Sequence, residues 1–387
     1  MARWLAVAFV LTAIQAGAVP QQSADSAVAL QAAVSRLGVF DDKARTEAAR
    51  TLRRAPADVV VPILAAAAKN QGDEYVRYRA LTLLSGFPGP TTAEVMAAVR
   101  ADRNDRLRTV AFSWYEHNPD PAALPALLDA FGKETSEFVR PALTRALAAQ
   151  SADPRARSVL ATLVMKGADF FRGSVIEGLG EYGGRFALAD IARVAELEGP
   201  LQDDAITAVG RLGDSSQVGL LAKLQRTAPQ QVQPTLSAAL CLLGQACDDS
   251  DKYLKDTLAF ASRSAGYQAL LRGAVHGQAM LALHGRKGAL DVLLDAGLAA
   301  KTESARAPIV LGLGVVALKQ PDLVMATLEG RRDLDETIAL FVEAFDMLSE
   351  DYEEERFFVA VRRAYWAAAE GSARRRVTEA LIVKLEF

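Results

Sequence analysis

The sequence contains few of the residues that most often build catalytic and metal sites. Its 387 residues include two cysteines and three histidines, His117, His276 and His284. A zinc site needs three or four ligands, and no acidic residue at helical spacing from His276 and His284 completes such a set. The motifs of serine hydrolases, zinc peptidases, P-loop proteins and dinucleotide-binding enzymes are also missing. We therefore expect a protein that is not an enzyme and has no metal or other cofactor.

The sequence also lacks a large excess of charge of either sign. Its 44 basic and 47 acidic residues give a net charge of -3. Proteins that bind nucleic acids neutralise phosphates with clustered Lys and Arg, so this balance argues against a nucleic-acid partner. After the N-terminal region, no stretch of about 18 uncharged apolar residues occurs. We therefore expect no membrane span after signal cleavage.

The N-terminus begins MARWLAVAFVLTAIQAGAVPQQ. Arg3 supplies a positive charge, Trp4 to Ile14 form an apolar segment, and Ala16-Gly17-Ala18 matches a small-x-small cleavage signature. The apolar run is too short to span the roughly 30 Å of a bilayer comfortably. These features predict a signal peptide over residues 1–18 and an exported protein, periplasmic or extracellular.

The two cysteines, Cys241 and Cys247, allow three interpretations. In an oxidising compartment they can form a disulfide across the intervening turn. A redox pair is a second reading, although their spacing is C-x5-C and differs from the C-x-x-C of redox motifs. Two buried, unpaired thiols are the third. Export favours the disulfide.

A repeat of about 32 residues runs through the chain. DEYVRYRALTLLSG at 73–86 has counterparts that place arginines at 45, 77, 108, 140 and 172, with spacings of 32, 31, 32 and 32 residues. Regular spacing in this range is typical of stacked structural repeats. Two later copies carry Gln202 and Gln233 in the arginine position, and the copies beyond residue 245 are more divergent.

Each copy predicts a helix, because apolar residues recur at the spacing of one helical face, as in Val76, Ala80, Leu83 and Leu84. A second set of apolar segments, such as VVVPILAAAA at 59–68, lies between these helices. No segment alternates apolar and polar residues as a half-buried strand does. We predict an all-α, right-handed α-solenoid of about eleven helix–turn–helix units over residues 19–387. Its repeats are clearest over 41–245, and 246–387 hold divergent repeats and a C-terminal cap.

The D-x-x-[VL]-R-x-x-A-x-x-x-L pattern at this period resembles HEAT (armadillo-like) repeats, most closely the short kind of phycobilin-lyase-like proteins. The resemblance implies an α-solenoid in which Asp and Arg form a ladder between neighbouring repeats. On this sequence the ladder would comprise Asp42, Arg45, Asp73, Arg77, Asp105, Arg108, Glu137, Arg140, Asp169 and Arg172. At Gln202 and Gln233 it would continue as uncharged hydrogen bonds or be broken.

Solenoid repeats contact only their neighbours, so binding normally uses the long concave surface. We expect a protein or peptide partner there. The residues predicted to face it are Tyr78, Arg79, Ser113, Arg145, Glu177 and Asp203. Two alternatives stay open: an enzyme-associated role, as a bilin-lyase-like or nucleic-acid-binding protein, and a purely structural spacer in an envelope complex.

Overall fold

A computed structural model describes residues 19–286, 288–348 and 351–387, so the predicted signal peptide at 1–18 lies outside the described residues. All regular structure in these ranges is helical, with 22 α-helices, three short 3-10 helices and no strand. This confirms the predicted all-α solenoid, because 22 helices correspond to eleven pairs. The helices are α1 (Val19–Arg36), α2 (Asp42–Arg54), α3 (Ala57–Asn70), α4 (Glu74–Ser85), α5 (Pro90–Val99), α6 (Asp105–His117), α7 (Leu124–Lys133), α8 (Arg140–Ala148), α9 (Pro154–Val164), α10 (Asp169–Glu181), α11 (Leu188–Ala195), α12 (Gln202–Leu212), α13 (Val218–Thr227), α14 (Gln233–Leu242), α15 (Cys247–Ala261), α16 (Gln268–Leu283), α17 (Ala289–Ala299), α18 (Glu303–Lys319), α19 (Pro321–Glu329), α20 (Leu334–Leu348), α21 (Asp351–Ala367) and α22 (Ala373–Lys384), with 3-10 turns at Arg185–Ala187, Ser215–Gln217 and Gln230–Val232.

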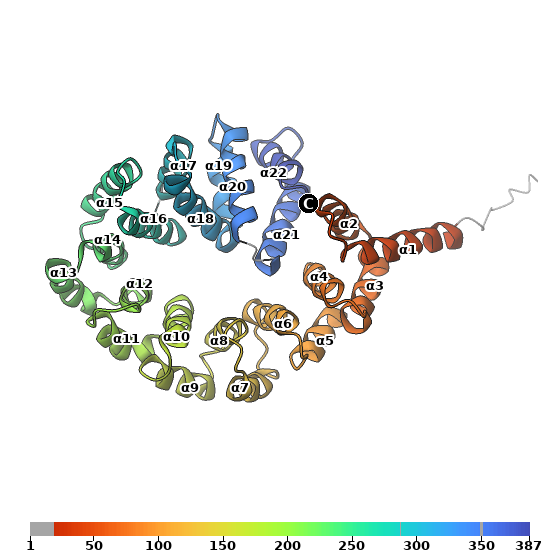
Figure 1. The fold of residues 1–387 in the computed structure, drawn as a ribbon, viewed down its shortest axis with the longest axis horizontal. Coiled ribbons are helices and arrows are strands. Elements are labelled where there is room, and N and C mark those ends of the chain that lie inside the picture. The colour runs from red at the N-terminus through yellow and green to blue at the C-terminus, as the bar shows by residue number, and fades with distance from the viewer. Residues whose placement is uncertain (1–18, 287, 349–350) are drawn as a thin grey trace, which may run out of the picture.

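The helix pairs curve until the two ends of the solenoid meet, so the chain forms a closed ring (Figure 1). From α4 to α18, the even-numbered helices form an inner layer and the odd-numbered helices an outer layer (Figure 1). The ring closes where α21 packs against α4 and α6. The Arg54 guanidinium also donates a hydrogen bond of 3.0 Å to the main-chain carbonyl of Phe387, the last residue.

Small residues between neighbouring inner helices explain the tight curvature. A Cβ atom on Gly180 of α10 would lie 2.8 Å from the Cα of Ala208 in α12, and one on Gly210 would lie 2.8 Å from the Cα of Ala239 in α14. The inner helices therefore approach to backbone contact. The outer helices contact one another less. Because the inner layer is shorter than the outer layer, the stack must bend. Gly180 lies in the glycine-rich segment GLGEYGG at 178–184, and its missing side chain permits this close approach.

The repeat pattern also explains how the inner helices begin. Asp73 precedes α4, and its carboxylate accepts hydrogen bonds from the Tyr75 and Val76 amides at 2.8 and 3.3 Å. These bonds satisfy amides that have no partner within the helix. Asn104 caps α6 in the same way, accepting from the Arg106 amide.

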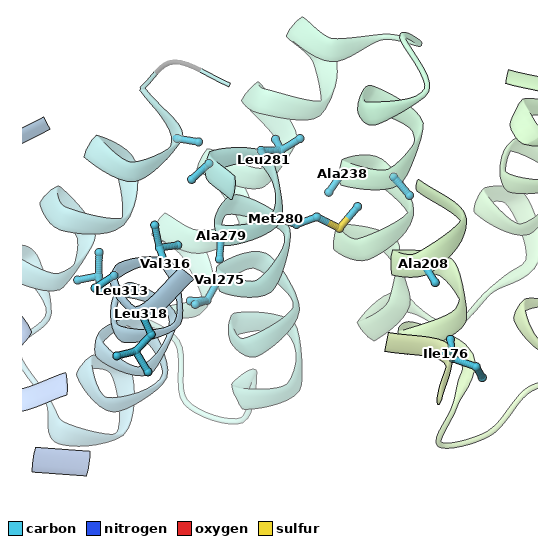
Figure 2. Packing of buried hydrophobic residues seen from close by; sticks show 14 of the residues in the cluster. Ile176, Ala208, Ala238, Val275, Ala279, Met280, Leu281, Leu313, Val316 and Leu318 are labelled. Atoms are coloured by element: carbon cyan, nitrogen blue, oxygen red, sulfur yellow. The ribbon is translucent and has the colours of Figure 1, made fainter. Parts of the chain in front are cut away.

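The hydrophobic core fills the wall of the ring between the two layers. Figure 2 shows this core at α10 to α18, where the Met280 side chain of α16 extends toward Ala238 of α14. Within the described residues, no single helix is long and apolar enough to cross a membrane. Helices α18 and α19 meet that length and composition only when taken together, and they are bent by 112° at their junction.

Candidate functional site

The repeated arginine holds each inner helix to the end of the preceding outer helix or its following loop. Its guanidinium donates to a main-chain carbonyl there in five consecutive repeats, and such terminal carbonyls have no partner within their own helix. The hydrogen bonds run from Arg45 to Val39 and Phe40 (2.9 and 2.6 Å), from Arg77 to Ala68 (3.0 Å), from Arg108 to Asp102 (2.7 Å), from Arg140 to Glu134 (3.1 Å) and from Arg172 to Val164 (3.0 Å).

The two glutamines at the arginine position make the equivalent bond without charge. The Gln202 amide donates to the Ala195 carbonyl at 3.1 Å, and the Gln233 amide donates to the Ala228 carbonyl at 2.9 Å. The contact therefore continues through both copies as uncharged hydrogen bonds. What the repeat keeps at this position is a side-chain donor.

The acids of the expected ladder behave less uniformly. Within one helical turn, Asp42 pairs with Arg45 at 2.6 Å, Asp105 with Arg108 at 2.7 Å and Asp169 with Arg172 at 2.8 Å. These three pairs lie inside a single repeat and do not connect two repeats.

The expected pairs Asp73–Arg77 and Glu137–Arg140 are wrong. The Asp73 carboxylate caps the start of α4. Arg77 instead pairs with Asp102, which lies just after the outer helix α5. Glu137 is exposed and forms no ion pair with any described residue. The Arg140 guanidinium lies between the rings of Phe131 and Phe171, 4.8 and 4.3 Å from their centroids.

The ion pairs that connect neighbouring repeats involve acidic residues that the sequence analysis did not identify. Arg77 reaches Asp102 after α5, and Arg108 reaches Glu134 after α7 at 2.8 Å. Burial raises the pKa of Glu134, but the hydrogen bonds from Arg108 and from the Ser136 amide outweigh it, so the pKa lies below its usual range. The repeated arginines, and the glutamines that replace two of them, are therefore structural.

An exposed aromatic stripe lies at the position two residues before the repeated arginine. Four successive repeats place Tyr75, Arg106, Phe138 and Phe170 there, and the three rings are 53%, 82% and 55% exposed, respectively. They lie beside a cavity of about 840 Å³ at the starts of α4, α6, α8 and α10. We call it the rim cavity; its lining includes Tyr75, Tyr78, Arg106, Phe138, Phe170 and Tyr352.

Stacked cationic and aromatic groups form one side of the rim cavity. The Arg106 guanidinium lies 5.4 Å from the ring centroid of Tyr75 and 5.5 Å from that of Tyr78. Arg79 approaches the Tyr75 ring at 5.5 Å. Such contacts hold the rings in place while leaving part of each exposed for a ligand.

An ion pair between half-buried Arg145 and buried Glu116 lies at the wall of the cavity. Arg145 of α8 donates to the Glu116 carboxylate at 2.9 Å, and the Tyr182 hydroxyl donates to the same carboxylate at 2.8 Å. Burial works against the charge on Arg145, but Glu116 and Glu177 outweigh it and raise the pKa of Arg145. Burial and the negative charge of Glu116 raise the pKa of Tyr182, so its hydroxyl stays protonated.

Glu116, His117 and Glu353 form the one group among the described residues whose ligand atoms could surround a metal ion. Their carboxylates already have protein partners. Arg145 and Tyr182 hold Glu116, while His117 lies 2.8 Å from Glu353 and Arg356 pairs with Glu353. Two guanidinium groups balance the two carboxylates, so a divalent cation would add two uncompensated charges. This arrangement favours an ion-pair network that joins α6 to α21 over a metal centre.

The six residues predicted to face a concave groove fall into three groups. Tyr78, Ser113 and Arg145 line the rim cavity. Arg79 donates to the Leu37 carbonyl at 2.6 Å and lines a different cavity of about 640 Å³, where the ends of the ring meet.

The other two, Glu177 and Asp203, line neither cavity. Glu177 lies 3.9 Å from Lys319 of α18. His276 and His284 also remain apart, because His276 contacts Thr207 and His284 bonds to the Met280 carbonyl.

The sequence reading missed Tyr75, Phe138 and Phe170, although their fixed offset from the repeated arginine was a usable signal. It also missed Tyr352 and Glu353, which reach the rim cavity from the far end of the chain. The repeat pattern could not predict that Tyr352 and Glu353 line this cavity, because their position depends on closure of the ring.

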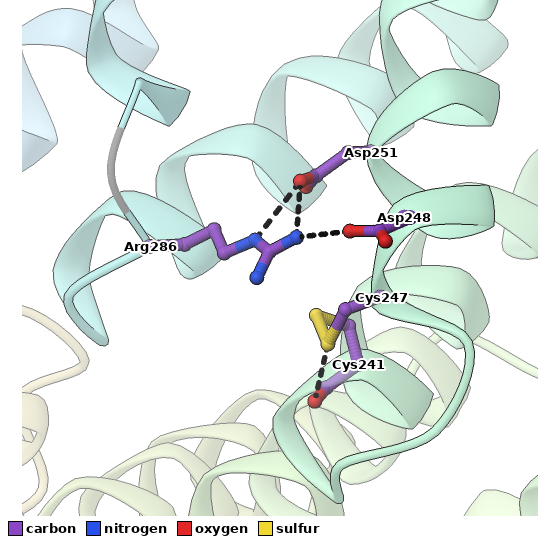
Figure 3. The surroundings of a disulfide bond; sticks show 5 residues. All are labelled: Cys241, Cys247, Asp248, Asp251 and Arg286. Atoms are coloured by element: carbon purple, nitrogen blue, oxygen red, sulfur yellow. Dashed lines mark hydrogen bonds and ion pairs between the residues drawn. A yellow bond between two sulfur atoms is a disulfide. The ribbon is translucent and has the colours of Figure 1, made fainter.

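Cys241 and Cys247 form a disulfide that joins the end of α14 to the start of α15 (Figure 3). The Cys247 sulfur lies 3.1 Å from the Cys241 carbonyl oxygen, a contact without a hydrogen bond because a disulfide sulfur carries no proton. Beside it, Arg286 pairs with Asp248 and Asp251 at 3.0 and 2.7 Å, which ties α15 to the loop after α16 (Figure 3).

Comparison with known proteins finds no matching protein family and no matching curated sequence. Many known structures are similar in fold, among them the following three. YibA of E. coli is 18% identical, with a TM-score of 0.40, over 59% of this chain and 83% of its own. Importin beta in an ammonium sulfate condition is 13% identical, with a TM-score of 0.38 over 94% of this chain, which spans only 59% of the importin beta chain. A chain from a homology model of the full-length AP-3 complex in an intermediate open conformation is 14% identical, with a TM-score of 0.40, over 96% of this chain and 77% of its own.

Proposed function

We propose that the protein is an exported, non-enzymatic scaffold that binds a protein or peptide partner at the rim cavity. The observation that carries this proposal is the exposed stripe of Tyr75, Phe138 and Phe170 beside a cavity of about 840 Å³. Large exposed rings grouped at a concavity mark interaction sites, since water solvates them poorly and a partner can cover them. The likeness to phycobilin-lyase-like repeats stays a prediction from the sequence.

The chemistry of the cavity indicates a ligand with apolar side chains and a polar backbone. Arg106 has no carboxylate partner among the described residues, and Glu137 lines the same cavity without a cation. A peptide can offer both an acceptor and a donor to these groups while its apolar side chains cover the rings.

Selection of a random peptide library displayed on phage would test this function. We expect enriched peptides to bind the purified protein, and the double variant Phe138→Ser/Phe170→Ser to weaken their binding at least about tenfold, because aromatic anchors carry most interface energy. Phe260→Ser is the matched control, since Phe260 is an exposed ring on α15, outside this cavity. Failure to enrich any peptide, or equal binding by both variants, would contradict the proposal.

The disulfide supports the export part of the proposal, because such bonds persist in oxidising compartments. Cell fractionation followed by N-terminal sequencing tests it. The expected result is a mature chain outside the cytoplasm that begins at Val19. A full-length chain that starts at Met1 and stays in the cytoplasm would overturn it.

A further inference from the structure

A second cavity, of about 880 Å³, lies between the ends of the outer helices α15 and α17 and the starts of α16 and α18. These helices lie across the ring from α6 and α8, which carry much of the rim cavity (Figure 1). We call it the basic groove and define it by Lys255, Leu258, Arg263, Val292, Ala296 and Lys301.

Small apolar side chains leave the groove open. Ala259, Ala261, Ala296 and Ala299 are among the residues that line it. A long side chain at any of these positions would fill the trough. The exposed rings of Phe260 and Tyr267 adjoin it in sequence and contact each other edge to face at 4.8 Å.

The charges of the groove are unbalanced. Lys255, Arg263 and Lys301 are exposed, and none of them forms an ion pair with another described residue. Asp295, the one carboxylate lining the groove, is bound to Arg331 at 2.8 Å. The groove therefore presents three uncompensated positive charges, although the whole protein is slightly acidic.

The helix dipole does not account for Lys255, although Arg263 and Lys301 each lie two residues beyond the end of a helix, α15 and α17. Basic residues favour the last turn of a helix, where the carbonyls carry partial negative charge. Neither α15 nor α17 has a basic residue in its last turn. Lys255 lies well inside α15, which ends at Ala261.

We propose that the basic groove docks an acidic peptide segment of a partner protein, with carboxylates on the three cations and apolar side chains on the alanine floor. Exposed cations attract such a segment and set its register, while burial of the apolar floor adds affinity. This proposal is independent of the function assigned to the rim cavity, because the two sites share no residue.

The test uses the full chain and a fluorescein-labelled peptide of alternating Glu and Leu, with fluorescence anisotropy as the readout. The triple variant Lys255→Glu/Arg263→Glu/Lys301→Glu should weaken binding at least about tenfold, since it turns three attractions into repulsions. The control triple Lys69→Glu/Lys166→Glu/Arg226→Glu changes the net charge equally, at exposed cations that do not line the groove. We expect it to change binding less than about twofold.

Two further variants distinguish docking in the groove from non-specific electrostatic attraction to the protein. Ala299→Trp leaves the charge unchanged and blocks the trough, so it should weaken the Glu/Leu peptide several-fold. The rim variant Phe138→Ser/Phe170→Ser should bind this peptide as the wild type does. Equal losses in both charge triples, no loss in either, or full binding by Ala299→Trp would overturn the proposal.

Discussion

Arg53 of α2 and Glu355 of α21 form an ion pair of 2.7 Å across 302 residues of sequence. Glu355 is only 1% exposed, and the Arg53 guanidinium also lies 4.9 Å from the ring centroid of Phe358. This contact joins the first repeat to the last one. Substituting Arg53 therefore tests whether this ion pair holds the ring closed.

Arg53→Ala should destabilise the closed ring by about 3 kcal/mol, because it leaves the Glu355 carboxylate buried without a partner. Arg50→Ala is the matched control, since Arg50 lies in the same helix and pairs with the exposed Glu386 at 3.6 Å. That loss should cost less than about 1 kcal/mol. Denaturant unfolding measures both, and small-angle X-ray scattering should show a larger radius of gyration for Arg53→Ala alone. Equal effects of the two substitutions would mean that Arg53 does not hold the closure.

The same carboxyl group predicts a pH dependence. Burial raises the pKa of Glu355 above its ordinary value, and the charges of Arg53 and Arg362 offset this only in part. The folded protein then holds a proton that the unfolded chain has released. Stability from this group is therefore full below the ordinary carboxyl pKa and is lost as the pH rises through the raised pKa.

Glu355→Gln removes this titration while it keeps the shape of the side chain. As the pH rises from about 4, the melting temperature of the wild type should fall relative to that of Glu355→Gln. A constant difference across the carboxyl range would show that Glu355 titrates normally.

The repeat, its helical type and the number of helix pairs could be predicted from the sequence, because each depends on local spacing. The spacing of the arginines at 45, 77, 108, 140 and 172 reports the stacking of one pair on the next. The partners of the arginines were not predicted. Asp102 and Glu134 each lie six residues before a repeated arginine, but the same position holds Val39, Gln71 and Lys166 in the other copies, so the pattern does not mark an acid there. Asp73 matched the pattern but was needed as a helix cap.

Ring closure could not be predicted for a different reason. Curvature is a small rotation at each repeat, and it is summed over eleven pairs. Small changes at Gly180 or Gly210 alter that sum without altering the helical pattern. The contact of Tyr352 and Glu353 with the rim cavity depends on the whole sum, so this part of the candidate site could not be predicted from local sequence.

Gly180→Ala tests the origin of the curvature. The added Cβ would lie 2.8 Å from the Cα and Cβ of Ala208, so α10 and α12 must move apart. We expect a loss of about 1–3 kcal/mol in unfolding free energy and a wider ring in scattering measurements. Gly219→Ala in α13 is the control, because a Cβ there meets no atom within 4 Å. It should be neutral or stabilise by up to about 1 kcal/mol. A tolerated Gly180→Ala with unchanged scattering would rule out close inner packing as the cause.

Arg108→Ala separates the structural role of the repeated arginine from binding. Arg108 donates to the Asp102 carbonyl and pairs with Asp105 and Glu134, and its side chain is mostly buried. Its loss leaves the nearly buried Glu134 carboxylate without a cation, so we expect a loss of about 2–4 kcal/mol in unfolding free energy. Arg103→Ala, in an exposed pair with Glu74 at 3.1 Å, should cost less than about 1 kcal/mol. Below the melting temperature, Arg108→Ala should bind peptides selected on the rim cavity within about threefold of wild type. Lost peptide affinity with intact stability would instead place Arg108 in the binding surface.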